Sequence, residues 1–183
     1  MMHSIRAWLL DLYEDAEDGV RLWFILETGE RMCLRQSMPV TFYAAGENDQ
    51  LRALWRFLRR YPEIVSLARE TRKDAFIIEP LVVLQAIVDS PMHQAILFRE
   101  TQRRFPDLTY YDADIPVSTR YAARYGTFPM AFCELVYDGD RSIQEIKTLN
   151  SRWDVAPIQP VLRILELEPD CDPGRTPPRA IRI

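Results

Sequence analysis

The order of apolar runs and amphipathic segments between residues 39 and 112 most constrains how this chain can fold. Two segments have helical periodicity, and short runs rich in β-forming residues surround them. In chain order the pattern predicts a strand at 39–44, a helix at 47–61, strands at 64–69 and 81–88, a helix from Ser90 to about Phe105 and a strand at 108–112. Residues 39–112 are therefore expected to form one unit of mixed helix and sheet.

The two predicted helices carry local signals for their faces and ends. In the first helix the apolar positions i, i+3, i+4 and i+7 form one stripe: Leu51, Leu54, Trp55 and Leu58. Pro62 ends this helix, and Ser90 can cap the second, with Pro91 in its first turn. The βαββαβ order is ferredoxin-like, a scaffold shared by many functions. RNA-recognition domains use it, but their Gly- and aromatic-rich signature is missing here.

The flanking segments add mainly β structure. Before residue 39, the sequence predicts strands at 5–13, 20–26 and 31–36. After residue 112, it predicts a helix at 114–126, a strand at 128–137, an irregular crossing at 150–160 and strands at 161–167 and 180–183. Gly126 occupies the position that ends the third helix. We therefore expect the α+β class, with an N-terminal β-sheet layer beside the ferredoxin-like part at 39–112.

Composition excludes several classes of protein. The chain has 183 residues and a net charge of −4, so no global basic field collects nucleic acid. Its cysteines, Cys33, Cys133 and Cys171, lie far apart and form no CxxC pair, which excludes a zinc ribbon. No apolar stretch approaches the ~18 residues of a membrane span, and the N-terminus is not a signal peptide. We expect a cytoplasmic protein without a membrane partner.

Arginine dominates the basic residues, because only Lys73 and Lys147 among the 23 are lysine. Five arginines on the second and third predicted helices are the candidate DNA-binding residues: Arg99, Arg103, Arg104, Arg120 and Arg124. The forked guanidinium group suits phosphate oxygens. The alternative interpretation is a solvated helix face paired with acids such as Glu100 and Asp107, since phosphate binding normally shows a clearer basic field.

Several aromatic side chains could stack on bases: Trp8, Trp23, Phe24, Tyr110 and Tyr111. They lie within apolar strands, which favours core packing for most of them. The chain carries no Gly-rich phosphate loop, nucleophile elbow or HExxH motif. We therefore expect no catalytic residue in it.

Residues 110–130 contain the most specific motif of the chain. It comprises Asp114-Ile115-Pro116, the pair Arg120-Tyr121, Gly126 and the exit Pro129-Met130. This stretch resembles the amino-terminal domain of family B DNA polymerases of the archaeal type. The opening strand, the acidic turn, the triplet Phe42-Tyr43-Ala44 and the βαββαβ order extend the likeness to nearly the whole chain. The resemblance implies one domain at 1–155 and, at 156–183, the truncated start of a ribonuclease H-like 3′–5′ exonuclease domain.

In that family the exonuclease domain opens on a strand with an aspartate-x-glutamate pair. The resemblance places Glu166 and Glu168 at these metal-binding positions, where alternation puts both carboxylates on one strand face. Glu166 departs from the family's aspartate, and the remaining metal-binding aspartates would lie beyond residue 183. We expect no exonuclease activity and no cofactor in this chain, with Mg²⁺ acting in the parent polymerase. The alternative for both glutamates is a solvated strand face.

Archaeal relatives also capture template-strand uracil in a pocket of this domain. The resemblance maps the pocket walls onto six positions: Val40, Pro91, Gln94, Phe98, Ile115 and Val117. Gln94 stands where the family has a small β-branched residue, and Phe98 where it has an arginine. These side chains would fill the space that a base must enter. We expect the pocket to be closed and uracil sensing to be absent.

The resemblance implies a non-catalytic domain that braces the exonuclease and polymerase domains and guides single-stranded template DNA. Its partners would be those two domains and template DNA, which it would bind weakly when alone. The alternative is a stand-alone ferredoxin-like interaction or regulatory protein that is unconnected with replication. A free-standing nuclease would need more acidic residues than follow Glu168.

Overall fold

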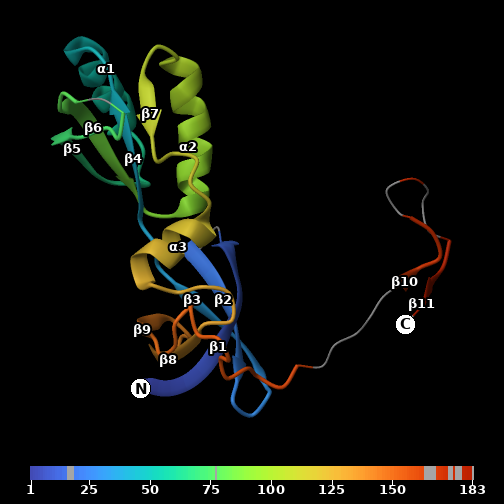
Figure 1. The fold of residues 1–183 in the computed structure, drawn as a ribbon. Helices are drawn as coiled ribbons and strands as arrows, with labels where there is room; N and C mark the ends of the chain where they lie inside the picture. The colour runs from blue at the N-terminus through green and yellow to red at the C-terminus, as the bar shows by residue number, and fades with distance from the viewer. Residues whose placement is uncertain (16–18, 77, 163–167, 173–174, 176–178, 183) are drawn as a thin grey trace.

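The computed structural model describes residues 1–15, 19–76, 78–162, 168–172, 175 and 179–182. These residues form two antiparallel sheets, three helices and a separate pair of short strands. Figure 1 shows the four-stranded sheet at one end of the molecule, the five-stranded sheet at the other and α3 (Val117–Tyr125) between them. The architecture is compatible with the α+β class that the sequence predicts.

The five-stranded sheet has the order β3-β2-β1-β8-β9 and is centred on β1 (His3–Asp15). The other strands are β2 (Gly19–Leu26), β3 (Arg31–Gln36), β8 (Phe132–Tyr137) and β9 (Ile143–Thr148). Ala7 lies opposite both Leu26 of β2 and Cys133 of β8, which joins distant parts of the chain. The sequence does not predict β9, because this edge strand fully buries only Ile143 and its polar residues hide the alternation.

The four-stranded sheet has the order β5-β6-β4-β7, and all its neighbouring strands are antiparallel. Its strands are β4 (Val40–Ala45), β5 (Ile64–Arg72), β6 (Leu81–Val88) and β7 (Thr109–Tyr111). α1 (Asn48–Leu58) connects β4 to β5, and α2 (Pro91–Arg104) connects β6 to β7. The elements thus follow the order that the sequence predicts for residues 39–112.

The ends of α2 and α3 depend on signals in the local sequence. Ser90 is the N-cap of α2: its hydroxyl accepts a hydrogen bond from the backbone N–H of His93 at 3.3 Å, and Pro91 follows it. α3 begins after Pro116, later than predicted, because a proline disfavours the helical conformation in the residue before it. Gly126 ends α3 in the left-handed conformation with φ of 68°, as predicted.

The apolar face of α1 differs from the predicted stripe. Trp55 is 39% exposed, whereas Phe57 is 7% exposed and lies in the core. The ring of Phe57 contacts that of Phe105, at the end of α2, with centroids 5.6 Å apart. The helix also ends at Leu58, earlier than residue 61. Contact between the two helix ends, which the local sequence does not show, selects Phe57 as the buried aromatic residue.

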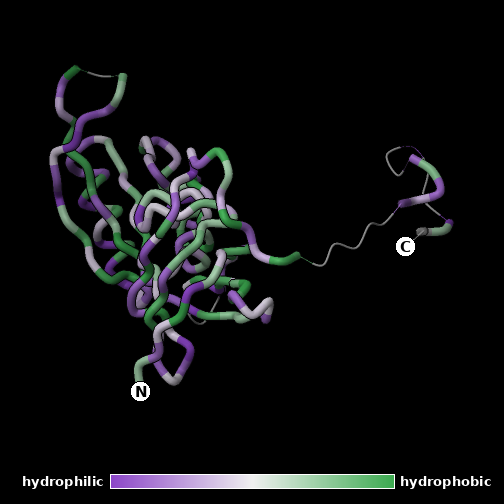
Figure 2. The backbone as a smooth tube through the Cα atoms, turned by 60° about the horizontal axis from the view of Figure 1, so that its bottom comes forward, coloured by the Kyte–Doolittle hydropathy of each residue, from purple (hydrophilic) through white to green (hydrophobic). Residues whose placement is uncertain are grey.

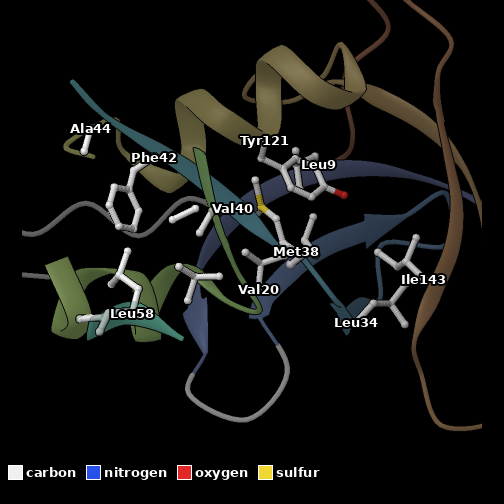
Figure 3. Close-up of a cluster of buried hydrophobic side chains, with 14 of the residues drawn as sticks. Leu9, Val20, Leu34, Met38, Val40, Phe42, Ala44, Leu58, Tyr121 and Ile143 are labelled. Carbon is white, nitrogen blue, oxygen red and sulfur yellow. The ribbon is translucent and has the colours of Figure 1, made fainter. Parts of the chain in front are cut away.

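One hydrophobic core connects the two sheets. Met38 lies between β3 and β4, and Figure 3 shows its side chain between those of Tyr121, on α3, and Val20, on β2. The buried cluster includes residues from both sheets and from all three of the helices described. Since buried apolar side chains from the two sheets pack in one cluster, we expect the two sheets to stabilise one another.

Residues after β9 are largely irregular, as predicted for 150–160. The indole Nε1 of Trp8 donates a hydrogen bond to the carbonyl oxygen of Ile158 at 2.9 Å, which ties this segment to β1. β10 (Glu168–Pro169) and β11 (Ile181–Arg182) pair with one another. Residues 161 and 162 are not in a strand, contrary to the prediction for 161–167, and 163–167 lie outside the described residues.

Candidate nucleic-acid interface

Three of the predicted DNA-binding arginines lie exposed along α2. Arg99 donates from Nε to the carbonyl oxygen of Ala95 at 3.1 Å, within its own helix. The Arg104 guanidinium lies 5.3 Å from the ring centroid of Phe57. None of Arg99, Arg103 and Arg104 forms an ion pair with an acidic residue in the described part of the chain. Their charges are therefore available to an anion.

A helix-stabilising role accounts for part of this arrangement. Arg103 and Arg104 lie in the last turn of α2, where backbone carbonyl groups make a partial negative charge. A cation in this place stabilises the helix whether or not it binds phosphate. The position of Arg99, further back along the helix, is not explained in this way.

Arg120, on α3, has a different environment from the α2 arginines. Its guanidinium donates hydrogen bonds to the backbone carbonyl oxygens of Ile115 at 3.1 Å, Thr41 at 3.0 Å and Asp112. Burial lowers the pKa of Arg120 below its usual value, and the charges of Asp112 and Asp114 act in the opposite direction. The donors of this side chain are thus engaged within the fold, which favours a structural role over phosphate contact.

Arg124, one turn further along α3, combines exposure with a link to the preceding sheet. Its Nη1 donates to the carbonyl oxygen of Pro39 at 3.3 Å, and its guanidinium lies 5.4 Å from the ring centroid of Tyr125. Arg120 and Arg124 therefore both tie α3 to the start of β4. The prediction that these two residues contact DNA stays a prediction.

The six positions of the predicted base pocket lie on β4, on α2 and around the start of α3. Val40, Pro91 and Gln94 are buried, whereas Phe98, Ile115 and Val117 are partly exposed. The Gln94 side-chain amide donates to the carbonyl oxygen of Ala113 at 2.8 Å. The Phe98 ring lies edge-on to Phe42 and Tyr110, with centroids 5.8 Å and 5.1 Å apart. Both residues that depart from the family thus have internal partners, and closure of the pocket stays a prediction.

The two predicted metal-binding glutamates lie near the C-terminal end of the chain. Glu166 lies outside the described residues, and Glu168 is exposed in β10. Among the residues that are described, no three His, Cys, Asp or Glu side chains gather in a way that could hold a metal ion. A metal site at these positions therefore stays a prediction, and we assign no chemistry to it.

The aromatic candidates divide between the core and the surface. Trp8 and Phe24 are buried, and burial raises the pKa of Tyr110 to about 12. Tyr111 instead lines a groove with a volume of about 440 Å³, together with Tyr43, a residue that we did not single out in the sequence. The alternation of side chains along β4 could have identified Tyr43 in the sequence, because it places Tyr43 on the face opposite to Phe42.

A second surface feature is the apolar segment at 153–162. Trp153 is 83% exposed, Ile158 74% and Val161 86%. Figure 2 shows hydrophobic residues along the chain where it leaves the body of the molecule. Contiguous exposed apolar side chains commonly mark a contact with another protein surface. No helix among the described residues is both long enough and apolar enough to cross a membrane.

No protein-family model matches this chain, and no curated protein matches it. Among solved structures, the chain is similar to the family B DNA polymerase from the hyperthermophilic archaeon Pyrobaculum calidifontis, with a TM-score of 0.60 and 21% sequence identity. The likeness covers 93% of this chain and 24% of the polymerase chain. At this level of sequence identity the likeness concerns the fold, and the activity of the polymerase does not follow from it.

Proposed function

We propose that this chain acts as the non-catalytic amino-terminal domain of a family B DNA polymerase. The observation that carries the proposal is the similarity of fold to such a polymerase over 93% of the chain. In this proposal residues 39–112 are a ferredoxin-like unit, and residues 156–183 begin an exonuclease domain of the ribonuclease H-like fold. The polymerase reaction and its Mg²⁺ ions would belong to the rest of the parent protein.

Guidance of single-stranded template is the first role that we propose. The exposed arginines of α2, which form no ion pair within the described ranges of the chain, support it, because they present charge to a phosphate backbone. With a net charge of −4, the whole chain would bind DNA weakly, and contact would depend on this local group. The proposal therefore expects weak, strongly salt-dependent binding by the isolated chain.

Bracing of neighbouring domains is the second role that we propose. The apolar segment at 153–162 supports it, since side chains such as Trp153 and Val161 expose most of their surface to solvent. The hydrogen bond from Trp8 to Ile158 holds this segment against β1, so its position is coupled to the five-stranded sheet. Residues 156–162 of this segment begin the exonuclease domain in the proposal, and we expect the segment to be covered by the rest of that domain and by the polymerase domain.

Binding of a labelled single-stranded oligonucleotide, followed by fluorescence anisotropy over a series of salt concentrations, tests template guidance. Replacing Arg99, Arg103 and Arg104 by alanine removes three phosphate contacts, so the slope of log affinity against log salt should fall by about 2. Alanine at the exposed Arg31 and Arg152 changes the charge elsewhere and should alter binding much less. Failure of the unchanged chain to bind even at low salt would end this part of the proposal.

The same assay tests the closed base pocket. Strands that contain uracil and strands that contain thymine should bind equally, because Gln94 and Phe98 already have partners within the fold. A clear preference for the uracil strand would contradict the expectation. If the Gln94 amide is what excludes the base, Gln94→Val should bind the uracil strand more tightly than the thymine strand.

The competing function is a stand-alone interaction or regulatory protein of ferredoxin-like fold. The neighbouring reading frames separate the two functions. An amino-terminal polymerase domain needs a partner that carries the polymerase's catalytic aspartates, whereas a stand-alone regulatory protein does not. Finding such a frame next to this one supports the proposal. Co-purification of the two products would then test bracing directly, and aspartate at Trp153 and Val161 should weaken their association.

A further inference from the structure

The four-stranded sheet is covered by helices on one face. Phe42 of β4 meets Phe98 of α2 on that face, and the same face contains Arg69, whose Nη2 donates to Asn48 Oδ1 at the start of α1 at 2.9 Å. Strand alternation places Tyr43, the next residue after Phe42, on the opposite face. This opposite face of the sheet, which neither α1 nor α2 covers, is the open face.

A row of polar and aromatic side chains crosses the open face. Tyr43 lies directly opposite Gln85 of β6 on one side and Tyr111 of β7 on the other. The Gln85 amide donates to the Tyr43 hydroxyl at 3.4 Å. Residues directly opposite in antiparallel strands have Cβ atoms about 5 Å apart, so the two tyrosine side chains are neighbours. Both tyrosines are partly exposed to solvent.

The end of β5 and the loop after it form a wall beside the two tyrosines. Arg72, Lys73 and Asp74 line this wall, with Val83 of β6 at the base, and enclose a groove of about 440 Å³. That volume falls within the range of small-ligand sites. The Arg72 guanidinium lies 5.3 Å from the ring centroid of Tyr43, which brings a cation over an aromatic face.

The groove carries charges of both signs, and some of them have partners within the fold. Arg72 forms an ion pair with Glu70. Asp74 accepts a hydrogen bond from the backbone N–H of Phe76 at 2.7 Å. Burial and the neighbouring Asp74 carboxylate raise the pKa of Tyr111.

Two further groups complete the charges that face the groove. Asp112 faces the positive charge of Arg120. Lys73 forms no ion pair with any acidic residue in the described part of the chain. The groove therefore combines two partly exposed tyrosines with an ammonium group that forms no ion pair among the residues described.

We propose that this groove binds one nucleotide of a single-stranded nucleic acid, with its base against Tyr43 and Tyr111 and its phosphate at Lys73. A nucleotide has the matching pair of features, a flat aromatic base and an adjacent anion. The Gln85 amide, which does not line the groove, donates to the Tyr43 hydroxyl and positions that ring. This site lies on the opposite face of the sheet from the α2 arginines and does not depend on a polymerase parent.

Substitutions that remove an aromatic ring but keep apolar volume test the site in the full chain. With a fluorescein-labelled single-stranded oligodeoxynucleotide at low salt, Tyr43→Leu and Tyr111→Leu should each weaken binding by about 5- to 100-fold. Tyr43→Phe and Tyr111→Phe keep the ring and should bind within about twofold of the unchanged chain. Tyr13→Leu, at an exposed tyrosine of the other sheet, is the matched control and should have no effect.

Lys73→Gln tests the phosphate contact separately from stacking. Loss of one phosphate contact should reduce the slope of log affinity against log salt by about 0.7. Arg72→Gln should have a smaller effect, since Arg72 already pairs with Glu70. An unchanged salt slope in Lys73→Gln would overturn the assignment of the phosphate to this residue.

Amide chemical-shift mapping of the unchanged chain keeps the proposal testable if a leucine variant fails to fold. The oligonucleotide should shift the signals of β4, β6, β7 and residues 72–74. Shifts confined to α2 would overturn this proposal and leave template guidance by the arginines standing. If the α2 arginine variant binds normally and the tyrosine variants lose binding, the groove site is supported and template guidance by the arginines is overturned.

Two other occupants of the groove are distinguishable in the same experiments. If the groove held a second copy of the chain, sedimentation would find a dimer that Tyr43→Leu dissociates. If it held a free mononucleotide, that compound would bind as tightly as the strand. Either result would overturn the proposal.

Discussion

At the scale of single residues, arginine side chains have different roles in different surroundings. Arg99 is exposed on α2 and has no acidic partner among the residues described, whereas Arg120 donates to three backbone carbonyl groups. Both were candidates for phosphate contact in the sequence. The carbonyl groups that engage Arg120 come from β4 and from the segment before α3, and no local pattern indicates that meeting.

Arg120 should matter more for stability than for binding. Arg120→Ala removes hydrogen bonds from a charged donor to three carbonyl groups and should lower the free energy of unfolding by about 2–3 kcal/mol. Arg120→Lys, with its single ammonium group, should recover only part of that loss. Urea denaturation measures both. Arg152→Ala, at an exposed position outside the helices and strands, is the control and should change stability by less than about 0.5 kcal/mol; equal losses in both alanine variants would contradict the structural role.

Buried tyrosines should make the fold sensitive to alkali. Burial raises the pKa of Tyr110 to about 12, whereas an unfolded tyrosine titrates near 10. Between these values the unfolded chain has lost the proton that the folded chain keeps, so raising the pH favours unfolding. The stabilising contribution is complete below about pH 10 and is lost as the pH rises towards about 12.

The pH dependence is measured as the urea midpoint over this range. Tyr110→Phe removes the titrating group and should flatten the decline, although it also removes the hydrogen bond from the Tyr110 hydroxyl to the Phe105 carbonyl oxygen. Burial also raises the pKa of Tyr121, so a residual decline is expected in this variant. A midpoint independent of pH between about 10 and 12 in the unchanged chain would refute the prediction.

At the scale of elements, the strength of the local signal decides which boundaries can be predicted. Ser90 with Pro91 specifies the start of α2, and Gly126 specifies the end of α3, because caps depend on adjacent residues. β9 lacks such a signal. It exists because β8 offers an edge with which residues 143–148 can pair, and that pairing partner is a property of the fold.

Three glycines provide a graded test of backbone strain. Gly126→Ala should cost about 1 kcal/mol, since its φ is +68° but the added methyl group meets open space. Gly19→Ala should cost at least about 1 kcal/mol more, because its Cβ would lie 2.8 Å from the Met38 nitrogen as well as at a φ of +92°.

Gly139→Ala is the control, because its added Cβ has no neighbour within 4 Å and its φ is not in the left-handed region. Thermal unfolding should rank the three variants in the order Gly19, Gly126, Gly139 from the largest loss to the smallest. A loss at Gly139 equal to that at Gly126 would contradict the assignment of the cost to φ.

At the scale of the whole molecule, the two sheets share one core. Met38 and Tyr121 lie among side chains of both layers, so neither sheet can lose its partner without exposing apolar surface. One face of the four-stranded sheet packs in this shared core and is therefore buried. The open face is left for binding, and it contains Tyr43 and Tyr111.

The shared core predicts a single unfolding transition. Trp8 reports on the five-stranded sheet and Trp55 on α1, beside the other sheet. In a variant whose only tryptophan, of the four in the sequence, is Trp8 or Trp55, its fluorescence and the far-ultraviolet circular dichroism should change at the same urea concentration. Coincident curves in both variants support one cooperative unit. Separate midpoints would show that the sheets unfold independently.

The sequence alone determined the order of the elements between residues 39 and 112, the start of α2 and the end of α3, because periodicity and caps depend on neighbours along the chain. The tertiary structure decided which side chains meet. Tyr43 and Tyr111 form a groove only because β4 pairs with β7, and Arg120 is engaged only because α3 packs beside β4. Strand register and helix docking join residues distant in the sequence, so no local pattern contains them.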